Sequence, residues 1–98
     1  MLLLDHLNEG SQRSSIKLAE AEEEAEQYGR RAAALGASLA ATLEAFVRFR
    51  GAFIAELAAI ARRRRLDVRE ATALLVEGEG AVDRLLVALT SGYTAGRT

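Results

Sequence analysis

Apolar residues recur along this chain with the spacing of a helix that packs against another helix. From about Ser15 one set falls every seven residues, at Leu18, Ala25, Ala32, Leu39, Phe46, Phe53 and Ile60. A second set lies between them, at Ala21, Tyr28, Leu35, Thr42 and Phe49. This alternating three- and four-residue spacing is typical of a coiled-coil seam. It predicts a long helix over about 15–65 with a helical partner along its length.

Three glycines interrupt this pattern without shifting its phase. Gly29, Gly36 and Gly51 each cost a helix about 1 kcal/mol relative to alanine. Because the seven-residue phase continues past all three, we expect one continuous helix, roughly 75 Å long if unbroken. The alternative is a break at 35–38, where Gly36 would end one helix and Ser38 would cap the next.

A helix boundary is predicted near residue 66. Asp67-Val68-Arg69-Glu70 has the form of an N-cap followed by an acidic third residue, and the arginines before it suit a helix C-terminus. The seam then continues through a C-terminal helix over about 67–91. The Glu-Gly-Glu-Gly sequence at 77–80 is where we expect a kink if this helix has one.

The two ends of the chain are predicted to be separate from these helices. Residues 1–14 form a short N-terminal segment in this interpretation, because Gly10 and the serines that follow mark a break. Residues 92–98 form a flexible polar tail. The chain has no proline, and its Ala/Leu/Glu/Arg bias is that of long helices. We therefore expect a single all-α domain in which the C-terminal helix folds back as a helical hairpin or bundle.

The composition also bears on location and on chemistry. Met1-Leu2-Leu3-Leu4 is followed at once by Asp5, without the basic residues that begin a secretory signal. The apolar stretch from Ala32 to Val47 contains Glu44 and falls short of the roughly 20 residues that span a bilayer. We expect a cytoplasmic protein without a transmembrane segment.

No group of residues in the sequence predicts catalysis, a metal or a cofactor. His6 is the only histidine and cysteine is absent, whereas zinc sites need several nitrogen or sulfur ligands. Carboxylates are plentiful at 20–26, but acid–base catalysis needs shifted pKa values in a water-poor site. A helix of this composition would expose those carboxylates to solvent. We expect a protein that is not an enzyme and needs no cofactor.

Small residues recur every four positions, at Ala25, Gly29, Ala33, Ala37 and Ala41. This spacing would let two helix backbones approach closely. The general abundance of alanine in the chain explains it equally well.

Charge is segregated between the two halves of the chain. Residues 1–47 carry 4 basic and 8 acidic groups and residues 48–98 carry 9 and 6, so their net charges are −4 and +3. The acidic block is Glu20, Glu22, Glu23, Glu24 and Glu26, and the basic block is Arg62, Arg63, Arg64 and Arg65. The two blocks lie at equal distances from residue 43, where no turn former occurs. The preferred interpretation is that two copies cross antiparallel, so that the arginines of one face the glutamates of the other.

Three other environments for the arginines remain open: nucleic-acid phosphates, a membrane surface and plain solvent. Nucleic-acid modules are usually basic overall, whereas this chain has a net charge of −1. A membrane-surface helix needs large apolar groups opposite its basic face, which Phe53, Ile54, Leu57 and Ile60 could supply.

Taken together, the sequence predicts a non-enzymatic interaction protein that forms homo-oligomers, preferably antiparallel dimers, and holds another protein. Its role would be that of a small adaptor, a chaperone-like partner or an accessory subunit. The interaction seam comprises Leu18, Ala25, Tyr28, Leu35, Leu39, Phe46, Phe49, Phe53 and Ile60. The alternative is a small regulatory nucleic-acid-binding protein that uses Arg62–Arg65.

A third alternative comes from Phe49-Arg50-Gly51 in the middle of the chain. This stretch resembles the central motif of the WXG100 family of secreted helical hairpins, with phenylalanine in place of tryptophan. Tyr93 is similar in position to the tyrosine of their secretion signal, but Arg97 stands four residues later where the family has an acid. The resemblance implies a secreted two-helix hairpin that turns at 49–51, although these residues continue the heptad phase.

Overall fold

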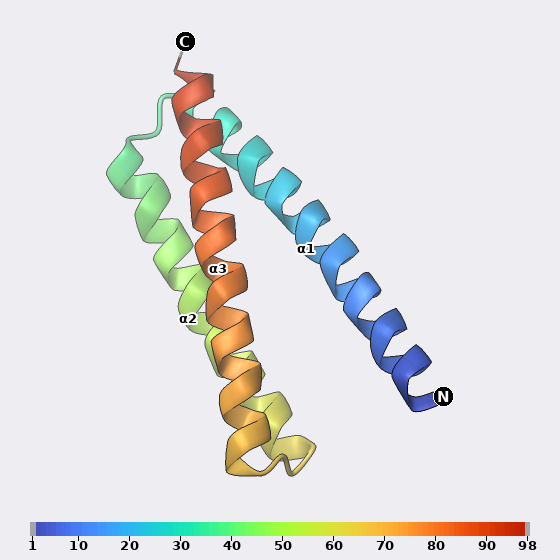
Figure 1. The fold of residues 1–98 in the computed structure, drawn as a ribbon. Helices are drawn as coiled ribbons and strands as arrows, with labels where there is room; N and C mark the ends of the chain where they lie inside the picture. Colours follow the sequence, from blue (N-terminus) through green and yellow to red (C-terminus); the bar gives the residue numbers. More distant parts are fainter. Residues whose placement is uncertain (1, 98) are drawn as a thin grey trace.

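The protein consists of three α-helices joined by two short turns (Figure 1). The computed structural model describes the backbone of residues 2–97 and the side chains of residues 17–97. Helix α1 spans Leu2–Ala34, α2 spans Leu39–Arg63 and α3 spans Val68–Gly96. No strand occurs among residues 2–97. The prediction of an all-α helical bundle whose C-terminal helix folds back is confirmed.

The prediction of one continuous helix over 15–65 is wrong. α1 ends at Ala34, and Gly36 adopts the left-handed conformation with a φ of 83°. The N–H of Ala37 donates to the carbonyl of Ala32 at 2.9 Å. This bond closes a Schellman motif, in which glycine is the residue best suited to the left-handed position. The chain therefore reverses at a point where the heptad phase indicated continuity.

Ser38 begins the next helix, as the alternative interpretation of residues 35–38 predicted. Its hydroxyl accepts a hydrogen bond from the N–H of Ala41 at 3.0 Å, which satisfies one of the free donors at the start of α2. α1 and α2 both pack against α3, so each keeps a regular apolar spacing although the turn separates them.

The turn between α2 and α3 repeats this geometry with different residues. The N–H of Leu66 donates to the carbonyl of Ala61 at 3.0 Å, and Arg65 takes the left-handed position with a φ of 53°. The Asp67 carboxylate accepts from the N–H of Glu70 at 2.8 Å, and the Glu70 carboxylate accepts from the N–H of Asp67 at 3.3 Å. The predicted capping box and helix boundary are therefore confirmed.

Both predictions for the chain ends are wrong. α1 begins at Leu2 rather than near residue 15. No residue before 15 excludes a helix, because Gly10 and the serines only weaken it and proline is absent. α3 continues to Gly96 instead of ending at 91, and it is one unbroken helix through 77–80. Its last turns have poor intrinsic helix propensity and are held by packing against α1.

α3 lies between the other two helices and carries most of the core. The core cluster consists of the buried residues Phe46, Val82, Leu85 and Leu89. Partly buried apolar side chains from all three helices pack against it, at Leu18, Ala21, Ala25, Leu43, Phe53 and Leu86. The apolar positions of α1 and α2 therefore meet a helix of their own chain.

Glycines allow α1 and α3 to cross with their backbones in contact. A methyl group built on Gly29 would lie 2.7 Å from the amide nitrogen of Tyr93, and one on Gly92 would lie 2.7 Å from the carbonyl carbon of Glu26. Gly96 makes a third such contact with α1, one turn further along α3. Close backbone approach through small residues, one of the two readings of the alanine and glycine pattern, therefore occurs at Gly29.

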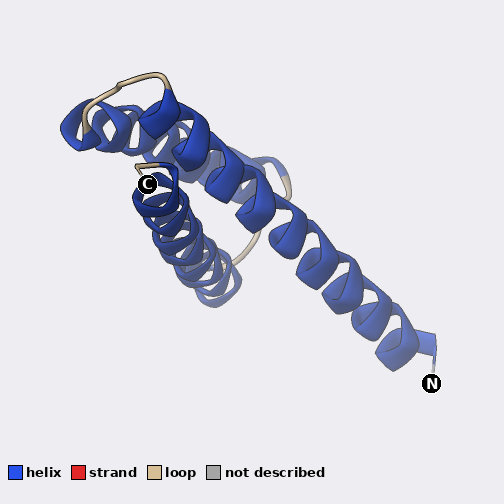
Figure 2. Cartoon of the chain, turned by 90° about the horizontal axis from the view of Figure 1, so that it is seen from above, coloured by secondary structure: helices blue, strands red, loops and turns tan. Residues whose placement is uncertain are grey.

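The molecule is elongated and open on one side. α1 and α2 both pack against α3 but make few contacts with each other, and the first half of α1 diverges to one side (Figures 1 and 2). The radius of gyration is 16.0 Å, whereas a compact chain of this length has about 13 Å. The accessible surface is 7433 Å², against about 5,400 Å² for a compact monomer of this mass.

Candidate functional site

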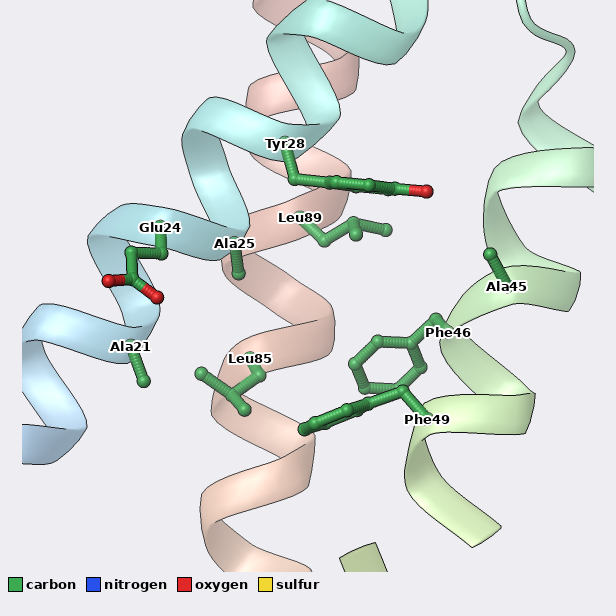
Figure 3. A pocket seen from close by; sticks show the side chains of 9 residues that line it. All are labelled: Ala21, Glu24, Ala25, Tyr28, Ala45, Phe46, Phe49, Leu85 and Leu89. Carbon is green, nitrogen blue, oxygen red and sulfur yellow. The ribbon is translucent and has the colours of Figure 1, made fainter. Parts of the chain in front are cut away.

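An apolar groove of about 430 Å³ lies between α1 and α2, with α3 as its floor. Figure 3 shows the ring of Tyr28 reaching from α1 toward α2, and the ring of Phe49 lying across the groove from α2. Leu85 and Leu89 of α3 lie between the two walls. The lining residues are Ala21, Glu24, Ala25, Tyr28, Ala45, Phe46, Phe49, Leu85 and Leu89.

Phe46 and Phe49 form most of the α2 wall of the groove, and Phe53 stacks against Phe49 outside the lining. The ring centroids of Phe46 and Phe49 are 5.8 Å apart, and those of Phe49 and Phe53 are also 5.8 Å apart. Phe46 turns into the core, but Phe49 and Tyr28 each remain 45% exposed. Large aromatic side chains held half-exposed beside a pocket are the anchors that protein interfaces most often use.

The predicted interaction seam is divided by the fold into two groups. Five of its residues, Leu18, Ala25, Phe46, Phe53 and Ile60, are buried or half-buried within the chain. Four are exposed, namely Tyr28, Leu35, Leu39 and Phe49. Much of the seam therefore serves the chain's own bundle, and two of its exposed members line the groove.

The acidic and basic blocks do not meet within one chain. Glu22 pairs with Arg84 of α3 at 3.1 Å, and Arg63 pairs with Glu56 of its own helix at 3.2 Å. Glu26 pairs within α1. These pairs lie at the surface, where an ion pair contributes little to stability.

The register predicted for antiparallel pairing between copies loses its geometric basis. It required one rigid helix with a pivot near residue 43, whereas the chain turns at 35–38. Glu20, Glu23 and Glu24 are exposed on α1, and their pairing with arginines of a second copy remains a prediction.

The arginine run lies at the turn between α2 and α3, at the opposite end of α3 from the C-terminus (Figure 1). Arg62–Arg65 are all exposed. The apolar residues Phe53 and Ile60 before them are half-buried in the bundle. These two residues therefore do not present the free apolar face that a helix lying flat in a membrane surface needs.

The described residues show no inorganic site. Among the described side chains, no three of the His, Asp and Glu type gather closely enough to hold a metal ion. His6 belongs to α1, but its side chain lies outside the described residues. Within residues 2–97, no helix combines the length and the apolar character needed to cross a membrane.

The features that resemble WXG100 hairpins occupy different structural positions from those the resemblance implies. Phe49-Arg50-Gly51 lies in the middle of α2, not at a turn. Tyr93 is 7% exposed, and its hydroxyl donates to the carbonyl of Ala37 at 2.8 Å. Its side chain therefore ties α3 to the first turn.

A scan of protein-family models found no match to this chain, and searches of curated proteins and of solved structures found none either.

Proposed function

We propose that this protein is a non-enzymatic helical interaction protein, and that a second copy of the chain covers the groove between α1 and α2. The observation that carries this proposal is the apolar groove, which no helix of the chain covers. Tyr28 and Phe49 line it and are each half-exposed. A further helix laid along this face would bury both rings and complete a bundle around α3.

The excess surface supports a copy of the chain as the occupant. Each chain exposes about 2,000 Å² more than a compact monomer of its mass. Obligate homodimers bury about 2,000–5,000 Å² in total, so an elongated chain with this much exposed surface can supply such an interface. Small domains also commonly depend on association, because their own cores are modest.

In this proposal other proteins bind outside the groove, and the chain serves as a small adaptor, a chaperone-like partner or an accessory subunit. Exposed valines at Val47, Val76 and Val87 lie away from the groove lining. They would remain accessible in the proposed dimer.

Sedimentation equilibrium of matched variants tests the proposal. We expect the wild-type chain to sediment at twice its mass of 10.5 kDa. Phe49→Glu should weaken the dimer at least a hundredfold, because an unpaired charge at a covered site costs about 3 kcal/mol or more. The control is Val87→Glu, which places the same charge at a position that is 66% exposed and outside the groove.

Circular dichroism should show unchanged helix content in both variants. A wild-type chain that stays monomeric at millimolar concentration would refute the proposal. So would a Val87→Glu variant that dissociates as fully as Phe49→Glu.

A further inference from the structure

The end of the α2–α3 hairpin concentrates positive charge that the chain leaves unpaired. Arg62, Arg64, Arg65 and Arg69 are exposed, and none forms an ion pair with any side chain among residues 17–97. We call these four residues, together with Val68, the arginine tip. The two acids at the tip, Asp67 and Glu70, accept backbone N–H groups in the capping box, so the four arginines and two acids leave a net charge of +2 there.

Arg65 occupies a backbone position that favours glycine. The first turn has the same hydrogen-bonding pattern and places Gly36 at the corresponding residue. A left-handed conformation costs a residue with a side chain roughly 1–2 kcal/mol. Arg65 therefore carries a strain that Gly36 avoids in the turn between α1 and α2. Backbone strain of this kind often accompanies a functional role, which points to one for the Arg65 side chain.

An apolar side chain projects among the arginines. Val68 is 83% exposed at the first position of α3, which makes it one of the most exposed large apolar residues of the chain. A guanidinium cluster around a protruding valine matches a surface with anionic groups outside and an apolar layer beneath. No aromatic residue occurs between 54 and 92, so the tip lacks the aromatic platforms on which the bases of single-stranded nucleic acid stack.

We propose that the arginine tip docks end-on onto a membrane surface that contains anionic lipid. The guanidinium groups would bind lipid phosphates and carboxylates, and Val68 would enter the headgroup layer. Each net positive charge near such a surface raises the partition coefficient about fivefold, so the net charge of the tip supplies roughly thirtyfold. The proposed dimer would present two tips and bind more tightly through avidity.

Vesicle co-sedimentation of the full chain tests this proposal. We expect the protein to sediment with vesicles of phosphatidylcholine containing about a third phosphatidylserine, and not with pure phosphatidylcholine. High salt should release it, because the attraction falls off within a Debye length. Val68→Ser should weaken binding several-fold by removing the apolar contact.

The decisive variant is Arg62→Gln/Arg64→Gln/Arg65→Gly, which should lower the partition coefficient about a hundredfold. Its glycine suits the turn, so the fold is retained. Arg48→Gln/Arg50→Gln/Arg97→Gln removes the same charge from exposed residues elsewhere and should bind nearly as well as wild type.

Three results would overturn the proposal. The first is equal binding of the wild type to neutral vesicles, and the second is full binding by the tip variant. The third is an absence of vesicle binding. In that case tip-dependent binding to a DNA duplex, or a tip-dependent change in self-association, would assign the arginines to nucleic acid or to the glutamates of a second copy.

Discussion

Arg65 and Gly36 occupy equivalent positions in two turns of the same geometry, with φ angles of 53° and 83°. Because only glycine adopts this conformation without strain, Arg65→Gly should raise the free energy of unfolding by about 1 kcal/mol. Gly36→Ala should lower it by a similar amount. Urea denaturation followed by circular dichroism measures both changes. A less stable Arg65→Gly variant would show that the arginine side chain supports the turn.

Gly92 and Gly51 separate the effect of packing from that of helix propensity. Gly92→Ala would drive a methyl group into the backbone of Glu26, so we expect a loss of at least 1–3 kcal/mol from overpacking. Gly51→Ala in α2 is the control, because the added methyl group would lie in open space. This substitution should raise the free energy of unfolding by about 0.5–1 kcal/mol. Equal effects of the two substitutions would contradict the close crossing of α1 and α3.

At the scale of the helices, one side-chain hydrogen bond joins α3 to the turn between α1 and α2. The hydroxyl of Tyr93 on α3 donates to the carbonyl of Ala37, in the turn between α1 and α2. Tyr93→Phe keeps the packed ring and removes this bond, so we expect a loss of about 1 kcal/mol. Hydrogen exchange should accelerate at 35–38 more than at the second turn, 64–67. Equal acceleration at both turns would indicate global destabilisation instead.

The sequence predicted those helix boundaries that depend on local chemistry. Asp67 and Glu70 are three residues apart and satisfy each other's backbone, so the second turn was visible in the sequence. The first turn was ambiguous, because Gly36 and Ser38 signal a break while the heptad phase signals continuity. The heptad phase led to the wrong prediction of one continuous helix, because a seven-residue repeat indicates only that a helix packs against another helix. It does not say whether that helix belongs to the same chain.

Tertiary packing decided the remaining boundaries. The C-terminal helix was predicted to end at 91, and the Thr90-Ser91-Gly92 stretch at that point has low helix propensity. The contacts of Gly92 and Gly96 with α1 nevertheless extend α3 to Gly96. The groove could not be predicted from the sequence either. It forms because α1 and α2 flank α3 and make few contacts with each other. The sequence placed Tyr28 and Phe49 in the interaction seam, but the surface that they share arises only from the turn at 35–38.

At the scale of the whole molecule, the open shape and the large accessible surface both arise because α1 and α2 make few contacts with each other. α1 and α2 pack against α3 and leave one apolar side of the bundle uncovered. The net charge of −1 offers little repulsion against association. The arginine tip lies at the far end of the hairpin from the C-terminus (Figure 1). A dimer formed through the groove would therefore leave both arginine tips at the periphery.

The most direct test of the covered groove is cysteine alkylation, since the chain has no native thiol. Ala45→Cys places a thiol in the groove wall, and Val87→Cys places one on the surface outside it. For the purified protein alone, we predict that alkylation at position 45 slows at least tenfold as protein concentration rises through the dimerisation range, while position 87 keeps its rate. Equal and concentration-independent rates at both positions would contradict a groove closed by a second copy.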